Sequence, residues 1–142
     1  MATYDLNLIR NTIATLFGTI TEIAFVYDRR NPTVEGYPCI IFDIDKSESE
    51  MLTNVENLRT ITFRVWIMTE IPVAGASQAN TILDNATTAV VNVVENISNL
   101  QLGGDITWLP PVEGARQEVS SPTGNLIWQI LDLRCRIISY VL

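Results

Sequence analysis

The sequence predicts an α+β domain: a single, mainly antiparallel sheet, one short N-terminal helix and one long helix packed on it, and a projecting β-hairpin. Apolar residues recur at helical spacing over residues 5–17 and 76–99. In several other segments apolar and polar residues alternate, as they do in half-buried strands. A chain of 142 residues has the length of one domain, so residues 1–142 are assigned to one.

The first helix is expected over residues 5–17, because its apolar residues return every three or four positions. Thr3 or Asp5 can cap its N-terminus. Gly18 is expected to end it, since glycine adopts a left-handed conformation at little cost. Alternating residues then predict a strand over residues 20–27.

The most informative segment is residues 37–67, which predicts two long strands joined by a polar, acidic connection. The first strand, residues 38–45, begins apolar on both faces and ends polar, so we expect its start to be buried and its end to project. The second strand, residues 58–67, alternates with a period of two. Its expected inward residues are Ile61, Phe63, Val65 and Ile67.

The hairpin between them, about residues 43–58, contains a small apolar cluster, Met51, Leu52 and Val55, among polar neighbours. Long connections with exposed apolar groups are typical of contact surfaces. The cluster either binds a partner or folds back on its own domain. The polar surroundings favour contact with a partner.

The long helix is expected over residues 76–99, with one continuous apolar stripe. Its opposite face is polar but almost uncharged, which reflects either the composition of the genome or packing against a neighbouring copy. In the second interpretation Asn85, Thr88 and Asn92 are candidate contacts. The polar face as a whole consists of Gln78, Asn80, Thr81, Asn85, Thr87, Thr88, Asn92 and Asn96.

The last third of the chain predicts a short strand over residues 106–109, an edge strand over 116–120 and a long closing strand over 126–141. In the closing strand Leu131, Leu133, Cys135 and Ile137 are expected to face inward. The outward row, Asp132, Arg134 and Arg136, is either a strand face protected against edge pairing or a surface that meets another copy.

The sequence offers little material for catalysis. It contains no histidine, the commonest general acid or base, and two cysteines cannot complete a zinc site. Asp43 and Asp45 share a strand face, but solvated carboxylates are far commoner there than a metal site. We therefore expect no enzyme activity, no catalytic residue, no cofactor and no metal. Cys39 and Cys135 are expected to be reduced core residues, with a disulfide between neighbouring strands as the alternative.

The formal net charge is −7, and the nine basic residues are scattered. This composition argues against DNA wrapping and against binding to an anionic membrane, but it suits a surface that DNA slides past. No run of about 18 apolar residues is present, so a membrane span is not expected. The first residues lack the basic start of a secretory signal.

The order of these elements resembles the tail-terminator proteins of long-tailed bacteriophages, the lambda-type minor tail protein U group, and related neck and tail-completion proteins. The resemblance rests on Tyr37-Pro38 before the second strand, the acidic hairpin, and the segments RTITFRVWI (59–67), LQLGG (100–104) and IWQILDLRCRIISY (127–140). The resemblance covers essentially the whole chain. It consists of the order and length of the elements and not of an invariant motif.

The resemblance implies a structural virion protein at the head–tail junction, made in the host cytoplasm. Its subunits would form a hexameric ring on the head-proximal end of the tail tube, end tube polymerisation and join the tail to the head connector. DNA would pass through the lumen without specific binding. The resemblance also makes the hairpin a contact arm and suggests a lumen-facing role for its acidic residues, Asp43, Asp45, Glu48, Glu50 and Glu56.

Two alternatives to the terminator function stay open at the level of sequence. One is a neck or head-completion protein of the same superfamily. The other is a small-ligand-binding α+β domain with a pocket between the long helix and the sheet. The continuous apolar stripe of that helix is expected to fill such a space.

Overall fold

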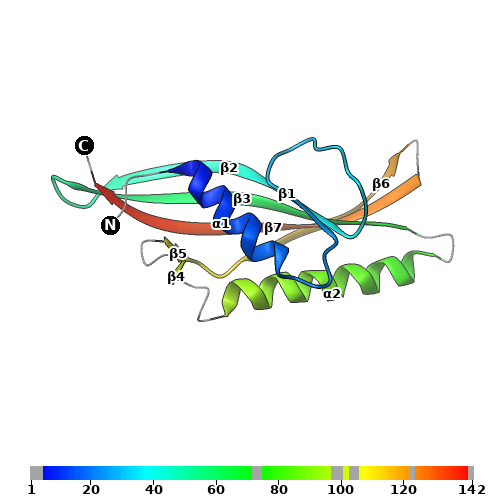
Figure 1. The fold of residues 1–142 in the computed structure, drawn as a ribbon. Helices are drawn as coiled ribbons and strands as arrows, with labels where there is room; N and C mark the ends of the chain where they lie inside the picture. Colours follow the sequence, from blue (N-terminus) through cyan, green and yellow to red (C-terminus); the bar gives the residue numbers. More distant parts are fainter. Residues whose placement is uncertain (1–4, 72–74, 97–100, 103–105, 122–123, 141–142) are drawn as a thin grey trace.

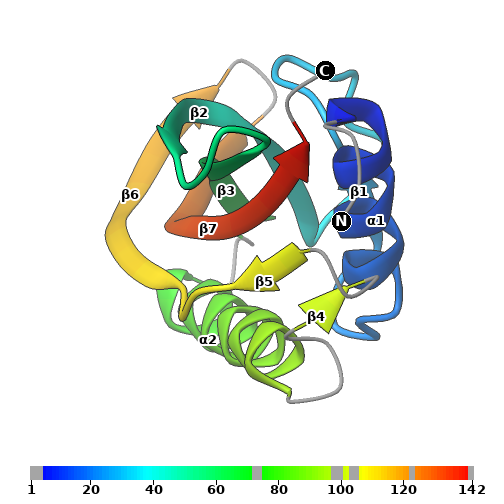
Figure 2. The same ribbon diagram turned by 90° about the vertical axis from the view of Figure 1, so that its left-hand side faces the viewer.

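A computed structural model describes residues 5–71, 75–96, 101–102, 106–121 and 124–140. The predicted α+β class is confirmed, because two helices pack on one strand-rich, curled sheet (Figures 1 and 2). In chain order the elements are α1 (Leu6–Gly18), β1 (Phe25–Tyr27), β2 (Cys39–Met51), β3 (Glu56–Glu70), α2 (Ala76–Glu95), β4 (Gln101–Leu102), β5 (Ile106–Trp108), β6 (Val112–Ser121) and β7 (Gly124–Tyr140).

Three long strands, β2, β3 and β7, form the length of the sheet (Figure 1). The strand order is β1-β2-β3-β7-β5-β4, and β6 pairs with β7. The neighbours β2–β3 and β3–β7 run antiparallel, whereas β1 lies parallel to β2, so the sheet is mixed. Of these strands, β4 was not predicted from the sequence, and β6 is longer than the predicted edge strand.

The start of α1 agrees with the sequence, but its end does not. The Asp5 side chain accepts a hydrogen bond from the Leu8 backbone N–H (3.2 Å), which confirms the predicted cap. Gly18 is the last helical residue, and Thr19 follows it in a right-handed conformation. The Thr19 N–H bonds back to the carbonyls of Leu16 and Phe17, so no left-handed glycine is needed to end the helix.

The predicted strand over residues 20–27 is wrong over its first five residues. Only Phe25–Tyr27 forms β1. The residues before it make successive turns, in which the Ile20 N–H bonds to the Phe17 carbonyl and the Ile23 N–H to the Ile20 carbonyl. Ile20 and Ile23 are both buried. A spacing of three puts both on the same side of a turn, which alternation along a strand would not do.

The core lies between the helices and one face of the sheet. Phe17 of α1, Phe42 of β2 and Phe63 of β3 form an edge-to-face series, with ring centroids 5.6 Å and 6.1 Å apart. The inward faces of β3 and β7 follow the predicted alternation. Their buried residues are Ile61, Phe63, Val65, Ile67, Leu131, Leu133, Cys135 and Ile137.

The long helix α2 ends at Glu95, earlier than predicted, because Asn96 is already extended. The predicted helical residues 97–99 lie outside the described residues. Thr87 is buried, although the sequence placed it on the polar face. It lies four residues after Leu83 and three before Val90, both fully buried, and so it belongs to the core-facing stripe.

Candidate functional site

The most prominent surface feature is an extension of the sheet, residues 46–61, here called the arm (Figure 1). Its two strands pair regularly as far as Met51 and Asn57, and residues 52–55 turn the chain. The backbone N–H groups of Leu52 and Thr53 close the turn by bonding to the Glu56 carbonyl (3.0 and 3.2 Å). Strand β7 pairs with β3 as far as Glu56. The arm is therefore braced by a third strand, where the sequence indicated a two-stranded hairpin with an irregular acidic connection.

At the end of the arm lie the three predicted contact residues, here called the apolar tip. Met51, Leu52 and Val55 are 72%, 45% and 54% exposed. None of them is folded back onto the domain. Isolated apolar side chains on a surface are normal, but three together at the end of a rigid extension form a patch that water solvates poorly.

Charged residues of β2 and β7 share one face in rows that span three strands, whereas Arg59 of β3 falls on the opposite face. Lys46, Thr62 and Arg134 form one row of neighbours, and Glu48, Thr60 and Arg136 form the next. The alternation of side chains along β2 puts Glu50 on the same face, and both glutamates are exposed. The structure thus brings the predicted basic pair of β7 and two of the predicted acidic residues to the same surface.

The other predicted acidic residues differ in their surroundings. Arg64 lies 3.8 Å from Asp45 and 3.3 Å from Asp132, so it bridges a predicted acidic residue and a predicted contact residue. Glu56 is half-buried near the turn. Asp43 lies inside an ion-pair network at the base of the arm, and the five carboxylates do not form one continuous surface.

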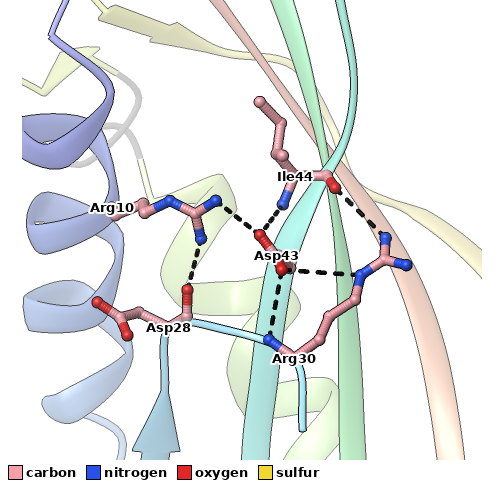
Figure 3. Close-up of polar contacts among 5 residues, drawn as sticks. All are labelled: Arg10, Asp28, Arg30, Asp43 and Ile44. Carbon is pink, nitrogen blue, oxygen red and sulfur yellow. Dashed lines mark hydrogen bonds and ion pairs between the residues drawn. The ribbon is translucent and has the colours of Figure 1, made fainter.

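That network joins three segments of the chain around Asp43 (Figure 3). Arg10 of α1 donates to the Asp43 carboxylate at 2.6 Å and to the Asp28 carbonyl at 2.6 Å. The Arg30 backbone N–H donates to the other Asp43 oxygen at 3.3 Å. The Arg30 guanidinium also donates to the Ile44 carbonyl at 3.3 Å. Together these bonds fix the loop after β1 to both α1 and β2.

The electrostatics of Asp43 follow from these contacts. Burial alone would raise the pKa of Asp43. Hydrogen bonds from the Arg10 side chain and from the backbone N–H groups of Ile44 and Arg30, with the positive charge of Arg10, outweigh burial. The pKa of Asp43 therefore lies below its usual range, and the carboxylate stays ionised at neutral pH.

Beside this network is an aromatic groove of about 320 Å³, on the face of the sheet opposite the helices. The Arg30 guanidinium lies over the Trp66 ring, 5.3 Å from its centroid. The groove combines sheet residues with the loop that the Asp43 network fixes. Its lining is Arg30, Asn31, Pro32, Val34, Ile41, Trp66, Met68 and Trp128.

The predicted contact residues of α2 lie on a separate surface. Asn85, Thr88 and Asn92 are exposed, as predicted. At the other edge of the helix Arg116 of β6 donates to Asp84 at 2.7 Å and to Gln129 of β7 at 3.0 Å. Arg116 also donates to Asn80 of the polar face at 3.2 Å, so it links α2 to the sheet, while Asn85, Thr88 and Asn92 stay exposed.

Sequence reasoning missed Arg10 and the groove, although both left a signal. Arg10 lies four residues after Leu6 and three before Ile13, within the apolar stripe of α1. A basic residue on a buried helix face indicates an acidic partner elsewhere in the fold. Trp66 and Trp128 fall on the outward faces of their strands, where a large aromatic residue indicates a covered or contacting surface.

Both cysteines are buried and free, in strands separated by β3. Burial raises the pKa of Cys39 to about 11 and that of Cys135 to about 12. Within the described ranges no group of three or more histidine, cysteine, aspartate or glutamate residues converges on a possible metal position. Neither helix, over its described residues, has the length and apolar character needed to cross a membrane.

Comparison with known proteins identifies no family for this chain. No protein-family model matches the sequence. No curated protein matches it either. Among solved structures, a chain from the virion of a native gene transfer agent particle is similar, with a TM-score of 0.40 and 12% identity over 89% of this chain and 84% of that one. At this TM-score the likeness carries no argument about fold or function.

Proposed function

We propose that this chain is a structural virion protein that acts as a tail terminator. Six copies would form a ring on the head-proximal end of a phage tail tube, end its polymerisation and connect the tail to the head. The observation that carries the proposal is the apolar tip, Met51, Leu52 and Val55, held in water at the end of a three-stranded arm. The order of elements in the sequence points to the same family.

A closed ring needs two different surfaces on each subunit, because each copy meets a different side of the next. The chain has several separate candidates. The arm bears the apolar tip, the neighbouring strand β7 bears Arg134 and Arg136, and α2 bears the uncharged face of Asn85, Thr88 and Asn92. An uncharged polar face suits an interface, since burying it removes no unpaired charge from water.

The charge of the chain also suits a ring through which DNA passes. The net charge is −7, and Glu48 and Glu50 are exposed on the arm. A negatively charged lumen repels the phosphate backbone and lets DNA slide without sticking. In this proposal the protein binds no DNA sequence, needs no cofactor and catalyses no reaction.

The proposal is tested by mixing the purified protein with tail tubes and imaging them by negative-stain electron microscopy. We expect six-fold rings of the free protein and a cap at one end of each tube, with tubes that no longer elongate. Association with head connectors but never with tubes would favour a neck protein instead. A protein that stays monomeric and binds neither would contradict the proposal.

A further inference from the structure

We propose that the aromatic groove of one copy receives the apolar tip of the next copy. The inference rests on the proposed ring and names the contact that would build it. The groove and the tip both expose apolar side chains on the described surface. One is a concave site of about 320 Å³ with two tryptophans, and the other is a convex cluster of three aliphatic side chains.

The two features cannot meet within one copy. The tip lies at the end of the arm, beside Asn57, whereas the groove is built around Trp66 on the same strand. Nine residues of extended strand separate these positions, which is about 30 Å. Figure 1 shows the tip and the loop over the groove well apart along the strands. A contact between them is therefore head-to-tail, which is the geometry that closes rings.

The chemistry of the two surfaces is complementary. Methionine packs adaptably against aromatic rings through its polarizable sulfur, so Met51 suits a site lined by Trp66 and Trp128. Tryptophan is also the residue type most enriched where interface energy concentrates. A volume of about 320 Å³ lies at the small end of binding pockets, and so suits a few side chains better than a folded segment.

Exposed charges of opposite sign lie beside the two surfaces, and two of them also have partners within the chain: Arg30 lies 3.8 Å from Asp43 and Glu48 lies 3.6 Å from Lys46. Arg29 and Arg30 are the one adjacent pair of basic residues in the sequence; Arg30 lines the groove and Arg29 is exposed next to it. The apolar tip is flanked along β2 by the exposed Glu48 and Glu50. Docking would bring these glutamates toward the two arginines, which adds attraction and orientation.

The groove is also fixed in place before docking. The loop that forms its outer wall is held by the bonds of Asp28, Arg30 and Asp43 to α1 and β2 (Figure 3). Arg30 itself reaches over Trp66. A preformed site avoids the entropy cost of ordering a loop on binding.

A mixing experiment tests the inference, because a head-to-tail contact uses two different surfaces and each can be removed in a separate variant. One variant, Met51→Ser/Leu52→Ser, keeps the groove and loses the tip. The other, Val34→Glu, keeps the tip and puts an acidic group into the groove. Removing two apolar side chains that docking would bury corresponds to roughly a 100-fold loss of affinity or more. Each variant alone is expected to be monomeric, and an equal mixture is expected to give heterodimers and nothing larger.

Two controls separate docking from damage to the fold. Thr33→Glu introduces the same charge on the same loop at an exposed position outside the groove lining, and it should assemble like the wild type. Circular dichroism spectra should match in all variants, and the midpoint of urea unfolding should be unchanged when it is compared with that of unassembled wild-type subunits. A second readout is a short bis-maleimide cross-link between Leu52→Cys in one copy and Val34→Cys in another, which should form only when both are present.

The outcomes distinguish a failure of the proposed contact from a failure of the proposed function. Rings that form normally from Val34→Glu protein, or a failure of the Leu52–Val34 cross-link within wild-type-like rings, would overturn the contact and leave the terminator proposal standing. If Val34→Glu protein forms normal rings that no longer cap tubes, the groove binds the tail tube and not the neighbouring copy, and the contact is overturned as well. A wild-type protein that never associates would overturn both.

Discussion

The Arg10 guanidinium donates a hydrogen bond of 2.6 Å to the Asp43 carboxylate and so joins the first helix to the strand that becomes the arm. Both side chains are largely buried, at 7% and 18% exposure. The same carboxylate also orders the loop that forms one wall of the aromatic groove. One ion pair therefore fixes the base of the arm and one wall of the groove.

Breaking this pair should destabilise the monomer substantially. Arg10→Met leaves the Asp43 carboxylate buried without its main partner, and we expect a loss of about 3 kcal/mol or more in the free energy of unfolding. Urea denaturation measures it. Arg30→Met is the matched comparison, because Arg30 is half exposed and 3.8 Å from Asp43, and should cost about 1 kcal/mol or less. Equal effects at the two positions would contradict this reading of the network.

The Asp43 carboxylate should also give the protein a recognisable acid sensitivity. The pKa of Asp43 is lower in the folded state than in the unfolded chain, where the pKa of an aspartate is about 3.9. Stability from this group is therefore complete above that unfolded pKa and is lost as pH falls through the folded pKa. The stability difference between wild type and Asp43→Asn should shrink with falling pH below about 5. A difference independent of pH down to acid unfolding would contradict it.

A charge introduced into the stripe of α2 should unfold the domain. Val94 is fully buried against the sheet, so Val94→Asp buries an unpaired carboxylate and should cost more than about 4 kcal/mol. Asn92→Asp adds the same charge two residues earlier on the exposed face, and there it should change stability by less than about 0.5 kcal/mol. Thermal unfolding followed by circular dichroism distinguishes the two. A folded, stable Val94→Asp protein would show that the stripe is not the core.

The two thiols should be inert in the folded protein. Burial raises their pKa to about 11 for Cys39 and about 12 for Cys135, so neither forms a thiolate near pH 8. A thiol-specific chromogenic reagent should therefore react with neither cysteine in buffer and with both in guanidinium chloride. Rapid reaction of the native protein, or a missing thiol after unfolding, would contradict the free, buried state.

The elements that depend on periodicity were predictable from the sequence. The stripes of both helices and the alternation of β3 and β7 follow from which residues are apolar, and the structure buries nearly all of them. The exposed tip was predictable for the same reason, since its neighbours are polar. Local patterns suffice where one face of an element meets the core.

Features that depend on long-range pairing were not predictable. Arg10 and Asp43 are 33 positions apart, and Arg116 reaches Asp84 over 32. Nothing local to either member of these pairs specifies its partner. The groove likewise combines a loop with three strands, so it exists only after the sheet has formed. The turn at residues 20–24 resembled a strand because its alternating polarity mimics one. Its first hydrogen bonds run instead from the Ile20 N–H to the Phe17 carbonyl of α1 and from the Ile23 N–H to the Ile20 carbonyl.

The most direct test of the account is the oligomeric state of the tip variant, measured by native mass spectrometry beside wild type and Leu8→Ser. Leu8 is an exposed apolar residue of α1, outside every proposed contact, and serves as the matched control. We expect hexamers from wild type and Leu8→Ser. Met51→Ser/Leu52→Ser should give monomers whose free energy of unfolding is within about 0.5 kcal/mol of an unassembled wild-type subunit. Hexamers that persist without the apolar tip would contradict the central claim that the arm makes the assembly contact.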